Sequence, residues 1–113
     1  MLIKIICGQM DIIPGRPDEN YKKILEIISA AKEKQADILL LPEMCIPGYL
    51  IGDLWEQQTF LDDCQYYAEQ IVAASQALCI MFGNVAFEKD KLNEDGRLRK
   101  YNAAVACQNG KIL

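Results

Sequence analysis

Two short apolar runs constrain the fold of this chain more than any other feature. LIKIIC at 2–7 is apolar apart from one lysine and stops at Gly8, and the Ile and Leu run at 38–41 stops at Pro42. Proline cannot donate a hydrogen bond to a sheet and restricts the residue before it, so it ends a strand cleanly. Both runs therefore predict short, largely buried β-strands.

The segment between these runs has the spacing of an amphipathic helix. Its apolar residues recur every three or four positions from Tyr21 to Ala31. We expect the helix to extend to about Lys34, with Asp18 as its N-cap or as an acidic residue of its first turn. A strand, a helix and a strand in this order predict a right-handed crossover between two parallel strands.

The second half of the chain predicts another helix and then antiparallel strands. The expected elements are a helix at 56–77, strands at 78–87 and 101–108 joined through a turn at 93–96, and a strand opening at 111–113 after Asn109 and Gly110. A natural domain seldom stops three residues into a returning strand. We therefore expect residues 1–113 to form one partial domain, truncated at its C-terminal end.

Charge and hydropathy exclude several classes of partner. The chain has 12 basic and 16 acidic residues, a net charge of -4, and neither sign is gathered into a tail that would suit a polyanion. No apolar run approaches the roughly 18 residues of a membrane span, and the N-terminal segment is too interrupted for a secretory signal. We expect a cytoplasmic protein that binds neither nucleic acid nor membrane.

The chain contains five cysteines and no histidine. The cysteines are widely spaced and form no CxxC pair, so buried reduced thiols are a better interpretation than a disulfide framework. Without histidine, the chain alone cannot build a Ser-His-Asp triad, a Cys-His pair or most zinc sites, and we predict no metal site.

Glu43 is the strongest candidate for chemistry. It follows the second apolar run, where open α/β sheets place their sites, and its apolar neighbours predict partial desolvation and a raised pKa, as a general base or acid requires. A turn cap on a backbone amide is the structural alternative. Cys45 lacks a nearby base for a nucleophile. Tyr49, after Gly48, could face a polar ligand or pack on the second helix.

Two further pairs receive structural interpretations. Trp55 and Phe60 are better explained as the apolar start of the second helix than as a base-stacking platform, because no basic stripe accompanies them. Asp62 and Asp63 are adjacent on a helix and point about 100° apart, so a solvated surface explains them better than paired catalytic carboxylates.

The segment LLLPEMCIPGY resembles the glutamate motif of the nitrilase or carbon-nitrogen hydrolase superfamily. CGQMDIIPGRPDEN, which ends on Asn20, resembles the first strand and helix entry of that family, and YNAAVACQNGKIL resembles its hairpin. The resemblance covers essentially the whole chain. GYLIGDLWEQQTFL is most similar to the glutaminase (glutamine amidotransferase) domain of glutamine-dependent NAD synthetases. Simpler amidases and nitrilases stay open.

This resemblance implies an α/β fold, the N-terminal part of an αββα sandwich whose mixed sheet carries two helices on one face. It also implies a Glu-Lys-Cys triad, of which only the general base, Glu43, lies in this chain. Tyr49 matches a substrate-binding position and Asn102 matches a residue that supports the site. The family's lysine and cysteine belong to segments after Leu113, and Lys111, at the turn end of a hairpin, is not that lysine.

The resulting hypothesis is a fragment of a glutamine-hydrolysing domain that is inactive as given. Its substrate would be a small amide, glutamine in the first instance. The domain itself needs no cofactor, and ATP and Mg would belong to a separate synthetase domain. An interaction module without enzymatic activity is the alternative from another class. In either case an unpaired sheet surface favours a homo-oligomer.

Overall fold

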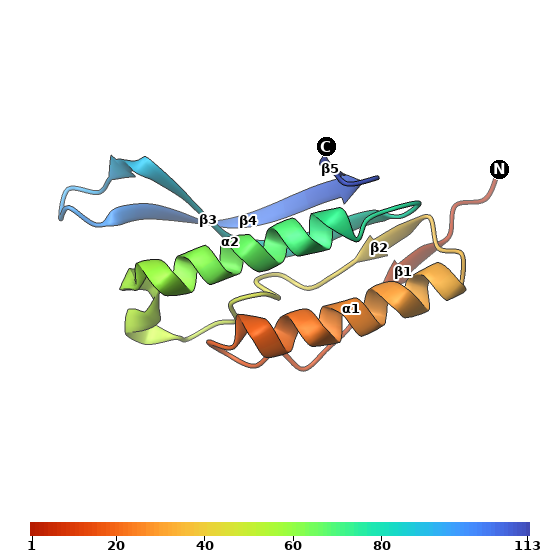
Figure 1. Cartoon of the computed structure of the whole chain (residues 1–113), viewed down its shortest axis with the longest axis horizontal. Coiled ribbons are helices and arrows are strands. Elements are labelled where there is room, and N and C mark those ends of the chain that lie inside the picture. Colours follow the sequence, from red (N-terminus) through yellow and green to blue (C-terminus); the bar gives the residue numbers. More distant parts are fainter.

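The computed structural model describes residues 1–113 and shows one five-stranded sheet with both α-helices on the same face (Figure 1). The strands are β1 (Ile5–Cys7), β2 (Ile38–Leu40), β3 (Cys79–Leu92), β4 (Leu98–Gln108) and β5 (Lys111–Ile112). The helices are α1 (Pro17–Glu33), the 3-10 helix η1 (Gly52–Glu56) and α2 (Gln58–Ala73). The expected mixed α/β sheet with two helices on one face is confirmed. None of the helices combines the length and apolar content of a membrane span.

The strands lie in the sheet in the order in which they occur in the chain. β1, β2 and β3 are parallel, with Ile38 paired to Ile5 on one side and to Cys79 on the other. β4 and β5 then return antiparallel. The parallel crossover and the antiparallel hairpin predicted from the sequence are both confirmed.

The hydrophobic core lies between the sheet and the helices. Leu39, Ile80 and Phe82 are fully buried on the helix-facing side, where they meet the apolar stripe of α1 that includes Ile24. Successive side chains of a strand point to opposite faces, so Met81 lies on the other side and is 40% exposed. No element of the chain covers that second face in Figure 1.

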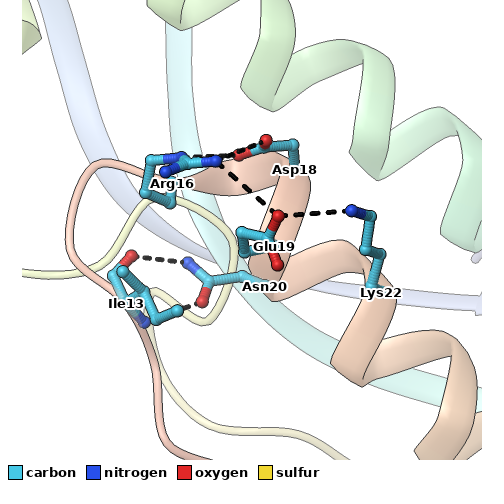
Figure 2. A network of polar contacts seen from close by, with 6 residues as sticks. All are labelled: Ile13, Arg16, Asp18, Glu19, Asn20 and Lys22. Carbon is cyan, nitrogen blue, oxygen red and sulfur yellow. Dashed lines mark hydrogen bonds and ion pairs between the residues drawn. The ribbon is translucent and has the colours of Figure 1, made fainter.

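The first helix begins at Pro17, so Asp18 is its second residue. Asp18 lies in its first turn, and Arg16 is the N-cap, so the N-cap alternative for Asp18 is wrong. Figure 2 shows why the acid is held there: the Arg16 guanidinium lies 3.0 Å from the Asp18 carboxylate. This hydrogen bond lowers the pKa of Asp18 to about 2.

The second helix is shorter than the predicted range of 56–77. Residues up to Glu56 form η1, and α2 ends at Ala73; the amides of the next two residues still donate to helix carbonyls, and the groups after them bind outside the helix. The amide of Ala77 donates to Asn109 Oδ1 at 3.0 Å, and the amide of Asn109 donates to the Ser75 carbonyl at 2.8 Å. The turn between β4 and β5 therefore terminates the helix, and no local sequence pattern predicts this contact.

The strand boundaries also differ from the prediction. The first strand begins at Ile5 rather than at residue 2, and Leu2 is almost fully exposed. The third and fourth strands extend toward each other, to Leu92 and from Leu98, around the predicted turn. The hairpin runs past the start of α2 in Figure 1, so cross-strand hydrogen bonds rather than core burial extend it.

All five cysteines are free thiols, as predicted. Cys45, Cys64 and Cys107 are buried and Cys79 is partly buried, but Cys7 is exposed, so the prediction of burial is wrong for Cys7. Cys7 is in register with Leu40 and through it with Met81, on the face that no helix covers. The apolar strand β1 is therefore not covered on both faces.

Truncating Leu39 should destabilise the fold far more than truncating its neighbour. Leu39→Ala should lower the free energy of unfolding by about 2–5 kcal/mol, because a fully buried side chain leaves a cavity. Leu40→Ala, on the uncovered face, is the matched control and should cost less. Urea unfolding followed by circular dichroism measures both, and equal losses would contradict the location of the core.

Candidate active site

Glu43 lies immediately beyond β2, where the chain leaves the sheet. The amide of Leu41 still donates to the Met81 carbonyl at 2.8 Å, and Pro42 then ends the pairing. Two positive backbone angles follow, a φ of 50° at Met44 and a φ of 82° at Gly48, and the Gly48 amide donates to the Met44 carbonyl at 2.9 Å. We call residues 43–49 the glutamate loop.

Gly83 of β3 allows the glutamate loop to lie directly against the sheet. A Cβ atom at this position would stand 2.3 Å from the Met44 nitrogen and 2.7 Å from the Glu43 Cα. Neither atom can move without displacing the loop, so glycine is required here for a close backbone approach. Sequence reasoning missed this role because the two segments are far apart in the chain.

Asn20 of α1 holds the other side of the glutamate loop. It is completely buried, and its Nδ2 donates to the carbonyls of Ile46 at 2.8 Å and Ile13 at 2.9 Å. Its Oδ1 accepts from the amide of Ile13 at 2.7 Å, as Figure 2 shows. The sequence singled out Asn20 only as a match to a family motif, and the structure adds that it joins two loops.

The three residues proposed from the sequence meet at one point. The Tyr49 hydroxyl donates to one oxygen of the Glu43 carboxylate, and the Asn102 amide of β4 donates to the other. Asn102 comes from a strand 59 residues later in the chain. Side chains therefore donate both hydrogen bonds, whereas the alternative of a turn cap requires a backbone amide.

The expected rise in the pKa of Glu43 is wrong for this chain. The hydrogen bond from Tyr49, and then the one from Asn102, lower the pKa of Glu43 below its ordinary value of 4.5. Desolvation acts the other way but is weaker, because the side chain is exposed. The same contact raises the pKa of Tyr49 to about 12. At neutral pH, Glu43 is an anion and Tyr49 is a neutral donor.

Glu43 borders an open hollow on the face of the sheet that the helices leave uncovered. The hollow has a volume of about 480 Å³, and Glu43, Gly83 and Asn102 lie along it with apolar residues that include Met81 and Ala104. Its size and lining suit a small molecule with an apolar stem and a few polar atoms.

None of the buried cysteines has the character of a nucleophile. Cys45 is closest in sequence to Glu43, but its thiol is buried and donates to the Gly83 carbonyl at 3.4 Å. Burial raises the pKa of Cys45 to about 11 and that of Cys64 to about 12. Lys111 is exposed on β5. No cluster of three or more His, Cys, Asp or Glu side chains could hold a metal ion.

Residues 4–113 match the family model described as carbon-nitrogen hydrolase. The chain belongs to the carbon-nitrogen hydrolase family. It is 31% identical over 111 residues to a glutamine-dependent NAD(+) synthetase of Xanthomonas campestris, an alignment that covers 97% of this chain and 19% of that protein. It is 44% identical over 52 residues to a 2-oxoglutaramate amidase of Bacillus subtilis, which covers 46% of this chain and 20% of that protein.

Solved structures agree with this family. The glutamine-dependent NAD(+) synthetase of Cytophaga hutchinsonii superposes with a TM-score of 0.84 at 26% identity, over 97% of this chain and 18% of that one. An amidase of Nesterenkonia has a TM-score of 0.80 at 18% identity, over 98% of this chain and 40% of that one, and shows the fold alone. This carbon-nitrogen hydrolase chain spans about a fifth of the length of the NAD synthetases that it matches.

Removing the Tyr49 hydroxyl should move the pKa of Glu43 back toward its ordinary value. Tyr49→Phe leaves the ring but removes the larger of the two hydrogen bonds that favour the anion. The lowered pKa stabilises the folded chain above pH 4.5, and this contribution is lost as the pH falls through the folded-state pKa. Tyr49→Phe should therefore weaken the acid dependence of stability.

Carboxyl-carbon NMR titration of Glu43 measures the shift directly. Tyr66→Phe is the matched control, because Tyr66 is 53% exposed on α2, away from the glutamate loop, and should leave the titration unchanged. An unchanged pKa of Glu43 in Tyr49→Phe would show that the hydroxyl does not hold the carboxylate in solution.

Proposed function

We propose that Glu43 is the general base of an amide C-N hydrolase of the glutaminase type. The observation that carries the proposal is the Glu43 carboxylate held by Tyr49 and Asn102 beside an open hollow, in a chain of the carbon-nitrogen hydrolase family. Similarity to glutamine-dependent NAD(+) synthetases over nearly the whole chain favours glutamine as the amide.

In this reaction Glu43 takes the proton of a cysteine thiol. The thiolate forms a bond to the amide carbon, and a lysine ammonium stabilises the oxyanion. Glu43 then returns the proton to the amide nitrogen, and ammonia leaves when the C-N bond breaks. Water then attacks the thioester, which releases the acid and restores the thiol. A carboxylate base explains how such a site works without histidine.

The residues of this chain supply one catalytic group and its supports. Asn102 orients the Glu43 carboxylate, while Tyr49, which is 46% exposed, lies where its hydroxyl can contact a substrate. The ionised Glu43 can accept a proton, and a segment that excluded water from it would raise its pKa and strengthen it as a base. The lysine and the nucleophilic cysteine are proposed to come from segments outside these residues.

We therefore propose that the 113-residue chain does not hydrolyse glutamine by itself. No buried cysteine can replace the nucleophile, and losing an oxyanion donor alone commonly costs about 10²-fold or more in rate. The domain is proposed to need no cofactor. ATP and Mg would serve a separate synthetase domain.

Ammonia release from glutamine tests both parts of the proposal. The chain should release no ammonia above the level of its Glu43→Gln variant. In the full product of the gene that encodes this sequence, Glu43→Gln should lower kcat by about 10²-fold or more, because the base is lost. Turnover by the 113-residue chain would contradict its proposed inactivity. A full-length Glu43→Gln variant that stays active would show that Glu43 is not the general base.

A second candidate function is self-association through the uncovered face of the sheet. On that face Ile5 is 54% exposed and Met81 is 40% exposed. A sheet face that carries large apolar side chains is normally buried against another layer. We propose that two copies of the chain pack these faces together, as a homo-oligomer or an interaction module.

Light scattering of the purified chain measures this association. Ile5→Lys should shift the chain toward the monomer, because a charge on the packed face must be desolvated. Tyr66→Lys, an equally exposed apolar position on the helix side, is the matched control and should leave the mass unchanged. A monomeric wild-type chain at high concentration would contradict the proposal.

A further inference from the structure

The position of Tyr49 depends on contacts at the two ends of its segment. The backbone groups of Tyr49 and Leu50 form no hydrogen bond with any other backbone group of the chain. Leu50 is 99% exposed and has a φ of 58°, so it does not anchor the segment by burial. Before Tyr49, the Gly48 amide donates to the Met44 carbonyl at 2.9 Å. The segment after Tyr49 needs an anchor of its own.

Glu56, the last residue of η1, provides an anchor on the hairpin of β3 and β4. Both oxygens of its carboxylate are 3.5 Å from the Lys100 ammonium of β4, and one is 3.7 Å from the Arg97 guanidinium. Lys100 also donates to the Leu98 carbonyl at 3.0 Å, and its side chain is only 17% exposed. A charge pair that is partly shielded from water is screened less than a fully exposed pair. Glu56 therefore fastens η1 to β4.

The same strand also holds Glu43. Asn102, two residues from Lys100 along β4, donates to the Glu43 carboxylate. Side chains two residues apart on a strand lie on the same face, about 7 Å from each other. Residues 43–56, which we call the arc, are therefore held to β4 at both ends, with Tyr49 between the two contacts.

One hollow adjoins both contacts of the arc. It has a volume of about 310 Å³, and its lining consists of Met44, Trp55, Val85, Lys100, Tyr101 and Asn102. The Trp55 ring also packs edge-on against Phe60 of α2, with ring centroids 5.9 Å apart. In Figure 1, η1 precedes α2 at the end of the molecule from which the hairpin projects. The two ends of the arc are therefore neighbours in space as well as along β4.

We propose that Glu56 and Lys100 are positioning residues of the candidate active site, which keep the Tyr49 hydroxyl in contact with the Glu43 carboxylate. Neither residue donates to that carboxylate, so both act through the arc. When η1 is released from β4, the segment around Tyr49 gains conformational freedom, and the hydroxyl spends less time on Glu43. Their importance for catalysis rests on the proposed function of Glu43, whereas their effect on the arc can be measured without turnover.

Glu56→Ala in the 113-residue chain separates positioning from the effect of charge alone. Removing an anion by itself lowers the pKa of a neighbouring carboxylate, whereas losing the Tyr49 hydrogen bond raises the pKa of Glu43 toward its ordinary value of 4.5. We expect the rise in carboxyl-carbon NMR titration. The backbone NMR order parameters of Tyr49 and Leu50 should fall from about 0.85 toward about 0.6.

Lys100→Met should have the same effects, while Lys100→Arg should retain the wild-type titration because the guanidinium keeps the ion pair with Glu56. Glu88→Gln is the matched control. It removes the ion pair between Glu88 and Lys91, 3.1 Å apart on the same hairpin, and should change neither measurement.

A double variant identifies the route of the effect. In the Tyr49→Phe background, Glu56→Ala should cause no further rise in the pKa of Glu43, because the hydrogen bond is already absent. A pKa of Glu43 that falls or stays constant in the single variant Glu56→Ala would overturn the proposal, whatever the order parameters. An active full-length Glu43→Gln variant would leave these measurements unaffected, so the proposed function and the positioning role fail separately.

Discussion

The contact between Gly83 and the backbone of the glutamate loop is the constraint on which the candidate site depends. The missing Cβ lets Glu43 leave the sheet in direct contact with β3 instead of rising away from it. Asn20 then closes the loop from the opposite side through the Ile46 carbonyl. Because both contacts act on the backbone, they fix the backbone position of Glu43 independently of the other side chains of the site.

The pKa of Glu43 depends on the exposure of its side chain to water. The apolar neighbours of Glu43 in the sequence predict desolvation, but the chain leaves one face of the sheet uncovered and the side chain is exposed. Two side-chain donors then dominate, and the pKa falls. A base tuned near neutrality therefore requires cover over this face, which links the chemistry of Glu43 to whatever packs there.

Local sequence patterns predicted the elements whose apolar residues are buried as those patterns indicate. The parallel strands around α1 were predicted because apolar runs, helical spacing and Pro42 act within short segments, and the family resemblance supported Tyr49 and added Asn102. The end of α2, the role of Gly83 and the sign of the Glu43 pKa were not predicted. Each is set by segments distant in sequence, whose contact leaves no periodic signal.

Neighbouring residues of β3 make different contacts on the two faces of the sheet. Gly83 faces the glutamate loop and Asn84 faces α2, because the strand presents alternate residues to opposite sides of the sheet. A shift of β3 by one residue against both neighbouring strands would exchange the two and place a buried amide against the Glu43 backbone. The long register between β3 and β4, with Gly83 opposite Ala104 and Asn84 opposite Ala103, excludes that exchange. The hairpin therefore fixes the contacts on both faces at once.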